Sequence, residues 1–318
     1  MRALYIEKGE ISLREIPDPI SGENEALIEV SSVGICNTDL ELIKGYMEFS
    51  GVPGHEFVGR VIKGSSDWIG KRVVGEINLG CGKCGACRRG MSRHCTGRSV
   101  LGIFNRQGAF ADLLSLPFEN LHIVPDDLSD EEAVFVEPLA AALRIPEQMK
   151  ITPGQNILLI GDGKLAQLIA RVLHLLAVKL EVVGKHEDKL ELLKSYSCKR
   201  HLLGEYEADG SYDLVIEASG SPEGLRIARE ALRPMGTIVL KSTYHGNVDF
   251  NFSSGVVDEI SIVGSRCGPF PPAIDLLARK LVNPGPLISD RFIFGDIEKA
   301  FERALEHDSL KVVVKMNE

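Results

Sequence analysis

The stretch NILLIGDGKLAQLIARVLHLLAVKLEVVG, residues 156–184, contains two apolar runs with a glycine-rich turn and an amphipathic segment between them. The first run, NILLIG, predicts a buried strand, residues 163–177 predict a helix, and LEVVG predicts a second strand. A strand, a crossover helix and a second strand in this order are typical of a parallel sheet. The stretch therefore predicts a doubly wound α/β domain.

The turn within this stretch has the spacing of a dinucleotide-binding loop. Gly161 and Gly163 stand where the strand gives way to the helix, and Ala166 takes the place of a third small residue. Small residues there let the backbone approach a pyrophosphate, which the N-terminus of the helix can hold. Glycines that merely end a strand are the alternative, but the second strand ends about twenty residues further on, as the fingerprint requires. We therefore expect Gly161, Gly163, Lys164 and Leu165 to meet a cofactor.

The remainder of the chain shows two kinds of sequence pattern. Residues 1–138 hold short strand-like runs broken by Gly and Pro, which is typical of a partly open β-barrel or sandwich. Beyond the opening stretch, YDLVIEAS, GTIVLKS and EISIVGS continue the strands of the α/β domain, with a helix over 222–232. The sequence predicts a β-rich domain over 1–138 and an α/β domain over 139–267, followed by 268–318 with a helix and a strand of its own.

Composition excludes several classes of partner. The chain has 318 residues, of which 44% are hydrophobic and 25% charged, and a net charge of −9. This acidic balance argues against a polyanionic partner, so neither nucleic acid nor an anionic membrane is expected. The N-terminal residues lack the apolar core of a signal peptide, and no apolar run is long enough to span a bilayer. We expect a cytoplasmic protein, in which thiols stay reduced.

Four of the seven cysteines lie within GCGKCGACRRGMSRHC, residues 80–95. The gaps between Cys81, Cys84, Cys87 and Cys95 hold Gly, Lys, Arg and Ser, so the segment of about 80–96 reads as a loop. In a reducing compartment, clustered cysteines at this spacing predict metal ligands rather than disulfides.

A second group of candidate ligands lies outside this lobe. Cys36 occurs in GICNTDLE, His55 and Glu56 occur in PGHEFVG, and Glu137 occurs in VEPLAAAL. A thiolate and an imidazole suit zinc, and a carboxylate can complete the set. Each residue alone is also typical of a structural role, as a buried thiol, a hydrogen-bonded turn or a helix cap.

Together these motifs resemble the zinc-containing medium-chain dehydrogenases/reductases, which include alcohol, sorbitol and threonine dehydrogenases. The resemblance rests on GICNTDL, PGHEFVG, CGKCGACRRGMSRHC, QGAFADLL, VEPLA, IGDGKLA and EASGSPEGL, which occur in the order typical of the family. It implies a GroES-like catalytic domain and a Rossmann domain, with 268–318 returning to the catalytic part. It also implies hydride transfer between an alcohol or polyol, or the matching ketone or aldehyde, and a nicotinamide cofactor.

The resemblance further implies two zinc ions per chain. The four cysteines would hold a structural zinc with no open position. Cys36 and His55 would hold a catalytic zinc, which acts as a Lewis acid. The third ligand of that zinc is left open between Glu56 and Glu137.

Three further residues would support the catalytic zinc. Asp39 would accept a hydrogen bond from His55 and fix its tautomer. Thr38 would relay the substrate proton. Glu41 stands where many members of the family have a histidine that completes the relay, and the segment between Asp39 and His55 is short for the family.

The end of the second predicted strand bears on the choice of cofactor. NAD enzymes of this fold usually have a carboxylate there that binds the ribose hydroxyls, and this chain has Gly184. The bases Lys185, His186 and Lys189 follow, and cations suit a 2′-phosphate. NADP(H) is therefore the expected cofactor. The alternative is NAD(H), with Glu187 or Asp188 of HED binding the ribose.

Other cofactor contacts follow from the resemblance alone. Lys311 matches the family's basic pyrophosphate contact, and Ser265, Arg266 and Cys267 match backbone that meets the nicotinamide. Ser219, in EASGS, is a further candidate.

Two other functions compete with this interpretation. A zinc-ribbon adaptor would explain the cysteine lobe but neither Cys36 and His55 nor the dinucleotide loop. A zinc-independent quinone reductase-like enzyme would have neither the lobe nor the Cys/His pair. The number of zinc ions separates the three, at two, one and none per chain. The expected partners are a small alcohol or polyol and further copies of the chain, as a homodimer or homotetramer through edge strands such as EISIVGS.

Overall fold

The computed structural model describes residues 1–243 and 248–316. The chain forms two compact units. The first unit combines Met1–Glu137 with Phe270–Glu318, and the second is Pro138–Pro269. Over the described ranges, no helix is both long and apolar enough to cross a membrane.

A seven-stranded sheet forms the centre of the first unit. Its order is β16-β17-β3-β4-β5-β9, and β8 also pairs with β3. The strands are β3 (Glu25–Gly34), β4 (Glu56–Lys63), β5 (Arg72–Gly75), β8 (Leu113–Pro117), β9 (Leu121–Ile123), β16 (Ile288–Ile293) and β17 (Lys311–Lys315). Because β17 pairs with β3, the last strand of the chain completes the sheet begun near its start.

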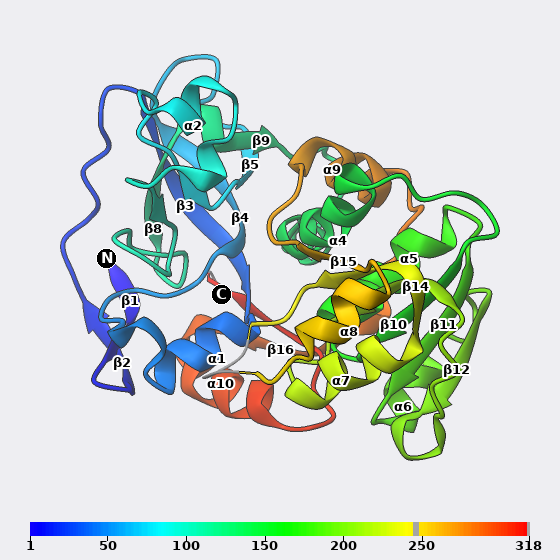
Figure 1. Cartoon of the computed structure of the whole chain (residues 1–318). Helices are drawn as coiled ribbons and strands as arrows, with labels where there is room; N and C mark the ends of the chain where they lie inside the picture. The colour runs from blue at the N-terminus through cyan, green and yellow to red at the C-terminus, as the bar shows by residue number, and fades with distance from the viewer. Residues whose placement is uncertain (244–247, 317–318) are drawn as a thin grey trace. The chain divides into compact units, whose positions relative to one another are not determined.

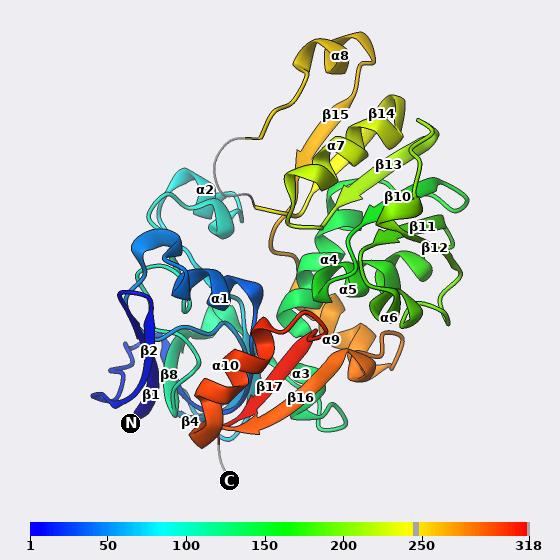
Figure 2. The same ribbon diagram turned by 90° about the horizontal axis from the view of Figure 1, so that it is seen from below.

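The other elements of the first unit are short. Two hairpin-like pairs are β1 (Arg2–Glu7) with β2 (Glu10–Glu15), and β6 (Asn78–Leu79) with β7 (Ser99–Val100). The helices are α1 (Asn37–Ile43), α2 (Gly85–Arg88), α3 (Asp130–Ala133), α9 (Phe270–Ala278) and α10 (Ile297–Leu305), and α4 (Val136–Gln148) runs across the boundary between the units. Figure 2 shows α10 alongside β16 and β17.

Apolar spacing explains how α10 packs. Ile297, Ala300 and Phe301 are buried, and their spacing of three and four residues places them on one face of a helix. The Phe301 ring meets the Phe110 ring edge-on, with 5.3 Å between centroids. The C-terminal segment therefore shares the core of the β-rich unit.

The second unit is built on a six-stranded parallel sheet (Figure 1). Its order, β12-β11-β10-β13-β14-β15, is the Rossmann order 3-2-1-4-5-6. The strands are β10 (Asn156–Ile160), β11 (Lys179–Gly184), β12 (Cys198–Leu202), β13 (Tyr212–Glu217), β14 (Leu232–Leu240) and β15 (Ser261–Gly264). The helices are α5 (Lys164–His174), α6 (Glu187–Glu191), α7 (Pro222–Ala231) and α8 (Phe252–Val257).

From the strand order, a ligand is expected at the carboxyl ends of β10 and β13. The order of the strands reverses between these two, which is the switch point where α/β sheets bind ligands. The β-rich part and the doubly wound part predicted from the sequence are both confirmed. The predicted helix over 163–177 is shorter, because α5 ends at His174 and Ala177 has a positive φ of 54°.

Candidate functional site

Strand pairing brings Cys36 and His55 together in the first unit. Gly34, the last residue of β3, is the register partner of Glu56, the first residue of β4. Cys36 follows β3 by two residues and His55 precedes β4 by one, so both lie at the same end of the pair. One ligand atom from each of Cys36, His55 and Glu56 lies within 4.8 Å of the others.

Asp39 fixes the backbone around these residues. Cys36 is the N-cap of α1, and Asp39 Oδ2 accepts a hydrogen bond of 2.8 Å from its backbone N–H. Asp39 Oδ1 accepts a hydrogen bond of 3.1 Å from Gly54 N–H. The same oxygen lies 3.4 Å from His55 Nδ1, which is longer than a well-formed hydrogen bond. One buried carboxylate thus holds the Cys36 turn and the His55 turn in place.

The environment of His55 favours positive charge. The side chain is buried, and among the described residues its Nδ1 makes no well-formed hydrogen bond. Burial lowers the pKa of His55, but Asp39 and Cys36 raise it well above its ordinary value. A partly buried thiol beside a buried imidazole and a buried carboxylate, in surroundings that favour a cation, fits zinc in the chemistry of the donors.

Glu56 has a second partner, Lys311, at the start of β17. Their side chains form an ion pair, and both are almost fully buried. Burial lowers the pKa of Lys311, but the charge and hydrogen bond of Glu56, together with the charges of Cys36 and Glu137, outweigh it and raise that pKa. The Lys311 ammonium also lies 5.6 Å from the centre of the Phe135 ring. The resemblance assigns Lys311 to a pyrophosphate, and this role stays a prediction. Within the first unit the Lys311 side chain contacts Glu56 and Phe135.

Gly34 makes room for this ion pair. A Cβ at residue 34 would lie 2.8 Å from Glu56 Oε2 and 3.2 Å from Lys311 Cδ. Any larger residue would push the pair apart. Gly34 is the first residue of GICNTDL, but no pattern in the sequence indicates that it leaves room for an ion pair.

The other predicted residues of this site lie around the same group. Thr38 Oγ1 is 3.8 Å from Cys36 Sγ. Glu41 pairs with Lys44 at 2.9 Å. Within the described part of the chain, the 4.8 Å group includes Glu56 but not Glu137, whose charge acts on Lys311. The third metal ligand stays a prediction with two candidates.

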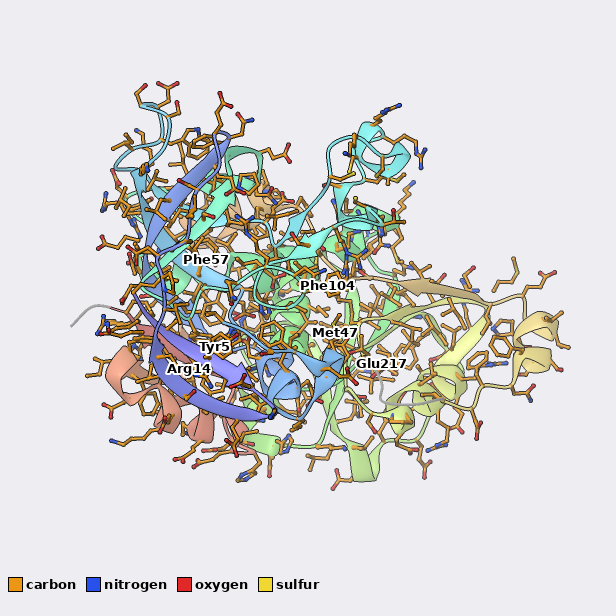
Figure 3. All side chains as sticks on the ribbon, turned by 90° about the vertical axis from the view of Figure 1, so that its left-hand side faces the viewer. Tyr5, Arg14, Met47, Phe57, Phe104 and Glu217 are labelled. Atoms are coloured by element: carbon orange, nitrogen blue, oxygen red, sulfur yellow. The ribbon has the colours of Figure 1, made fainter. Side chains whose placement is uncertain are left out.

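The short segment between Asp39 and His55 lines a hollow on the first unit. Residues 47–50 and 103–107 line a volume of about 410 Å³. Figure 3 shows Met47 and Phe104 beside one another, and both are partly exposed. This short segment therefore presents apolar surface.

The four cysteines of the lobe point their sulfurs at one another. Cys84 Sγ lies 3.5 Å from Cys87 Sγ and 3.7 Å from Cys95 Sγ, and all four Sγ atoms lie within 4.8 Å of each other. A tetrahedral zinc with bonds of about 2.3 Å separates its sulfurs by about 3.8 Å. All four cysteines are free thiols, so the spacing fits a metal and not disulfides.

Hydrogen bonds to sulfur prepare this lobe for a cation. Backbone N–H groups of Lys83 and Cys84 lower the pKa of Cys81 to about 6. Loss of water raises the pKa of Cys87 to about 11. Binding of a cation would favour the ionised form of all four thiols.

The glycine loop of the second unit has the shape that its sequence predicts. Gly161 has a φ of 127°, and a Cβ there would lie 2.6 Å from the carbonyl oxygen of Ala218. Gly163 is the N-cap of α5, which begins at Lys164 and continues with Leu165. The loop therefore passes close to the end of β13 and leads into a helix N-terminus, the usual cradle for a phosphate.

The residues after β11 differ in exposure. Lys185 is exposed, the His186 side chain is about one-third exposed at 32%, and Lys189 is buried. Asp162, which sequence analysis did not single out, lies against this segment. Its Oδ2 accepts hydrogen bonds from the backbone N–H groups of Lys185 at 2.6 Å and His186 at 2.7 Å. A signal was present in the sequence, since Asp162 lies between the two glycines of the loop.

The remaining candidate cofactor contacts are held by hydrogen bonds within the second unit. Ser219 donates from its Oγ to the buried Glu217 carboxylate at 2.6 Å. Lys241 Nζ donates to the carbonyl oxygen of Arg266 at 3.0 Å and to Ser265 Oγ at 3.3 Å. The sequence does not predict these contacts of Lys241, because a single lysine after a strand belongs to no recognisable motif. The partly buried Cys267 directly follows this pair.

Known proteins with similar sequences are dehydrogenases. The sequence profile of the alcohol dehydrogenase GroES-like domain matches residues 22–126. A sorbitol dehydrogenase of Halalkalibacterium halodurans is 27% identical, over 96% of each chain. An uncharacterized zinc-type alcohol dehydrogenase-like protein of Escherichia coli K12 is 29% identical, over 96% of this chain and 95% of its own length.

Two solved structures are similar over nearly the whole chain. A zinc-binding dehydrogenase from Sinorhizobium meliloti bound to NADP has a TM-score of 0.90 and 25% identity, over 99% of each chain. A short chain alcohol dehydrogenase from Escherichia coli CFT073 complexed with NADH has a TM-score of 0.92 and 25% identity, also over 99% of each chain. These similarities cover both the GroES-like and the Rossmann parts.

Proposed function

The chain belongs to the zinc-containing medium-chain dehydrogenase/reductase family, and from that premise we propose how its residues transfer a hydride between an alcohol or polyol and a nicotinamide cofactor. The observation that carries the proposal is the group of partly buried Cys36 with buried His55 and Glu56, in a chain that also has a Rossmann loop. An adaptor would need no such loop. A zinc-independent reductase would need no such ligands.

The chain's own residues would hold and orient the catalytic metal. Cys36 and His55 would be ligands, with Glu56 or Glu137 as the third. When bound, zinc supplies a Lewis acid that stabilises negative charge developing on the substrate oxygen. Asp39 would hold the His55 ring in one orientation, because it is itself fixed by two backbone N–H groups.

Proton movement would be the task of α1. The Thr38 hydroxyl is near Cys36 Sγ and can accept a proton from a substrate hydroxyl while donating its own. Glu41, one turn further along α1, would accept that proton, and Lys44 would hold its carboxylate. We assign the first unit to catalysis and the second unit to nucleotide binding. The predicted domain bounds of 1–138, 139–267 and 268–318 remain part of this proposal.

Replacing Glu137 tests the choice of third ligand. If Glu137 binds the metal or orients its surroundings, Glu137→Gln is expected to lower turnover or zinc retention about 10- to 100-fold. The measurement is zinc content and kcat against Glu147→Gln, a partly exposed acid on the same helix. Unaltered zinc and turnover would assign the role to Glu56.

Replacing Cys84 tests the structural role of the lobe. Cys84→Ser is expected to release one zinc and to lower the melting temperature by on the order of 10 °C, because a closed tetrathiolate site contributes folding energy and no open coordination position. Turnover of the protein that remains folded should change little. His94→Asn is the control and should keep both zinc ions. An unchanged melting temperature with lost turnover would reverse the roles of the two sites.

For the cofactor, we propose NADP(H). Gly184 leaves the end of β11 without a carboxylate of its own, and the exposed Lys185 follows it. A lysine beside a small residue suits a 2′-phosphate. One similar structure has NADP bound and another NADH, so the fold accepts both. The ratio of kcat/KM for NADPH and NADH tests the preference, and a higher value for NADH would contradict it.

For assembly, we propose pairing of two copies through β15, the edge strand of the second unit. Ile262 on β15 is partly exposed, and Val256 and Val257 on α8 are strongly exposed at 77% and 81%. An exposed apolar edge strand is a template for a second chain. Light scattering should give the mass of two or four chains, and a monomeric mass would contradict the proposal.

A screen of alcohols and polyols tests the activity itself. Formation of reduced nicotinamide is followed by absorbance, and zinc is measured on the same sample. We expect activity with at least one alcohol class and two zinc ions per chain. One zinc and no activity would favour the adaptor, and activity without zinc would favour the reductase.

A further inference from the structure

The last residue of β11, Gly184, has no carboxylate, but the carboxylate of Asp162 lies beside it. A Cβ built on Gly184 would lie 2.7 Å from both Cβ and Oδ2 of Asp162. The carboxylate of the glycine loop therefore occupies the position that a side chain of residue 184 would begin to fill. In NAD enzymes of this fold, that side chain is the acid that binds the ribose hydroxyls.

Asp162 is held there by one of its two oxygens. Oδ2 accepts from the backbone N–H groups of Lys185 and His186, and the His186 ring nitrogen Nδ1 lies 3.0 Å from the same oxygen. The other oxygen, Oδ1, takes no part in these three contacts. An acid fixed through one oxygen presents its charge and its second oxygen in a constant position.

The backbone of Asp162 is also anchored. Gln167 is fully buried, and its Nε2 reaches the carbonyl oxygens of Lys189 at 2.7 Å and of Asp162 at 3.4 Å. Arg171, buried as well, donates to Gln167 Oε1 at 2.8 Å. This chain of hydrogen bonds ties the glycine loop to α6, so the carboxylate and the Lys185 turn move together.

We propose that Asp162 is a specificity-determining residue for the cofactor, supplying from the glycine loop the negative charge that Gly184 does not provide. It would favour a ribose with free hydroxyls and oppose a 2′-phosphate, while Lys185 acts in the opposite direction. The preference of the protein is then the balance between the carboxylate of Asp162 and the ammonium of the exposed Lys185. This inference rests on the proposed function, since it needs a nicotinamide dinucleotide at the loop.

The competing explanation is that Asp162 only caps the turn before α6. The Asp162→Asn variant separates the two explanations. An amide oxygen can accept the same two backbone N–H groups, because both bonds use a single oxygen of the aspartate. The turn is kept and the charge is lost.

The experiment measures dissociation constants for NADPH and NADH by nucleotide fluorescence, with the full-length zinc-loaded protein at one ionic strength. In Asp162→Asn, the affinity for NADPH relative to NADH should rise about tenfold or more, as expected for loss of one nearby like charge. Lys185→Ala should lower the same ratio. Glu191→Gln, an exposed acid at the end of α6, is the matched control and should leave the ratio unchanged, whereas Asp188→Asn tests the alternative in which an acid of α6 binds the ribose.

The outcomes separate this inference from the proposed function. A constant ratio in Asp162→Asn, or a larger change in Asp188→Asn, would overturn the role of Asp162. If wild-type protein binds neither nucleotide, the proposed function itself fails. Asp162→Ser, which keeps a short acceptor for Lys185 N–H, serves as a second variant in case the amide folds poorly. Its ratio must rise in the same direction.

Discussion

Cys36→Ser and His55→Ala are each expected to remove one of two zinc ions and to lower kcat by more than about 100-fold, the upper end for residues that only support ligands. Both residues lie just outside the paired parts of β3 and β4. The sheet is held by the pairing of β3 with β4 on one side and with β17 on the other, so the first unit should stay folded. Zinc content, kcat and circular dichroism of each variant check this.

The control for these variants is another thiol. Cys198 is half-buried in β12 of the second unit and lies outside both ligand groups of the described residues. Cys198→Ser should keep both zinc ions and normal turnover. Two zinc ions and near-normal kcat in Cys36→Ser would show that the group of Cys36, His55 and Glu56 is not the catalytic centre.

The elements that could be predicted are those with a strong local signal. The glycine loop, the strands beside it and the cysteine lobe carry their signals in consecutive residues. β12 carried none, because CKRHL is polar and the strand lies at the edge of the sheet, where it packs on fewer neighbours. Its existence depends on pairing with β11, which no short-range pattern encodes.

Two contacts could not be predicted from the sequence, for a related reason. Asp162 meets residues more than twenty positions later, and Glu56 meets Lys311 across 255 positions. Each contact is set by which strands are neighbours in the sheets, β10 beside β11 and β3 between β4 and β17. The sequence indicates each contact only indirectly, by a glycine that leaves room for the distant side chain. These glycines are Gly184 beside Asp162 and Gly34 beside the Glu56–Lys311 pair.

The buried ion pair leads to the second large effect, on stability. Lys311→Met is expected to cost about 3–5 kcal/mol, because it leaves the Glu56 carboxylate buried without its partner. The cost should be present without any nucleotide, because it arises inside the first unit. A lysine that only meets a pyrophosphate would instead weaken NADH and NADPH binding and leave the melting temperature unchanged.

The pair is tested by a double-mutant cycle on thermal unfolding without nucleotide. Lys311→Met should lower the melting temperature by on the order of 10 °C. Glu56→Gln combined with Lys311→Met should lower it less than the sum of the two single variants, since no unpaired charge then remains in the core.

Lys315→Met, at the far end of β17, is the matched control. Lys315 is 52% exposed and pairs with Glu131 at 3.5 Å, so its loss should cost under about 1 kcal/mol. Additive effects in the cycle, or equal losses for both lysines, would show that the Lys311–Glu56 pair does not support the fold.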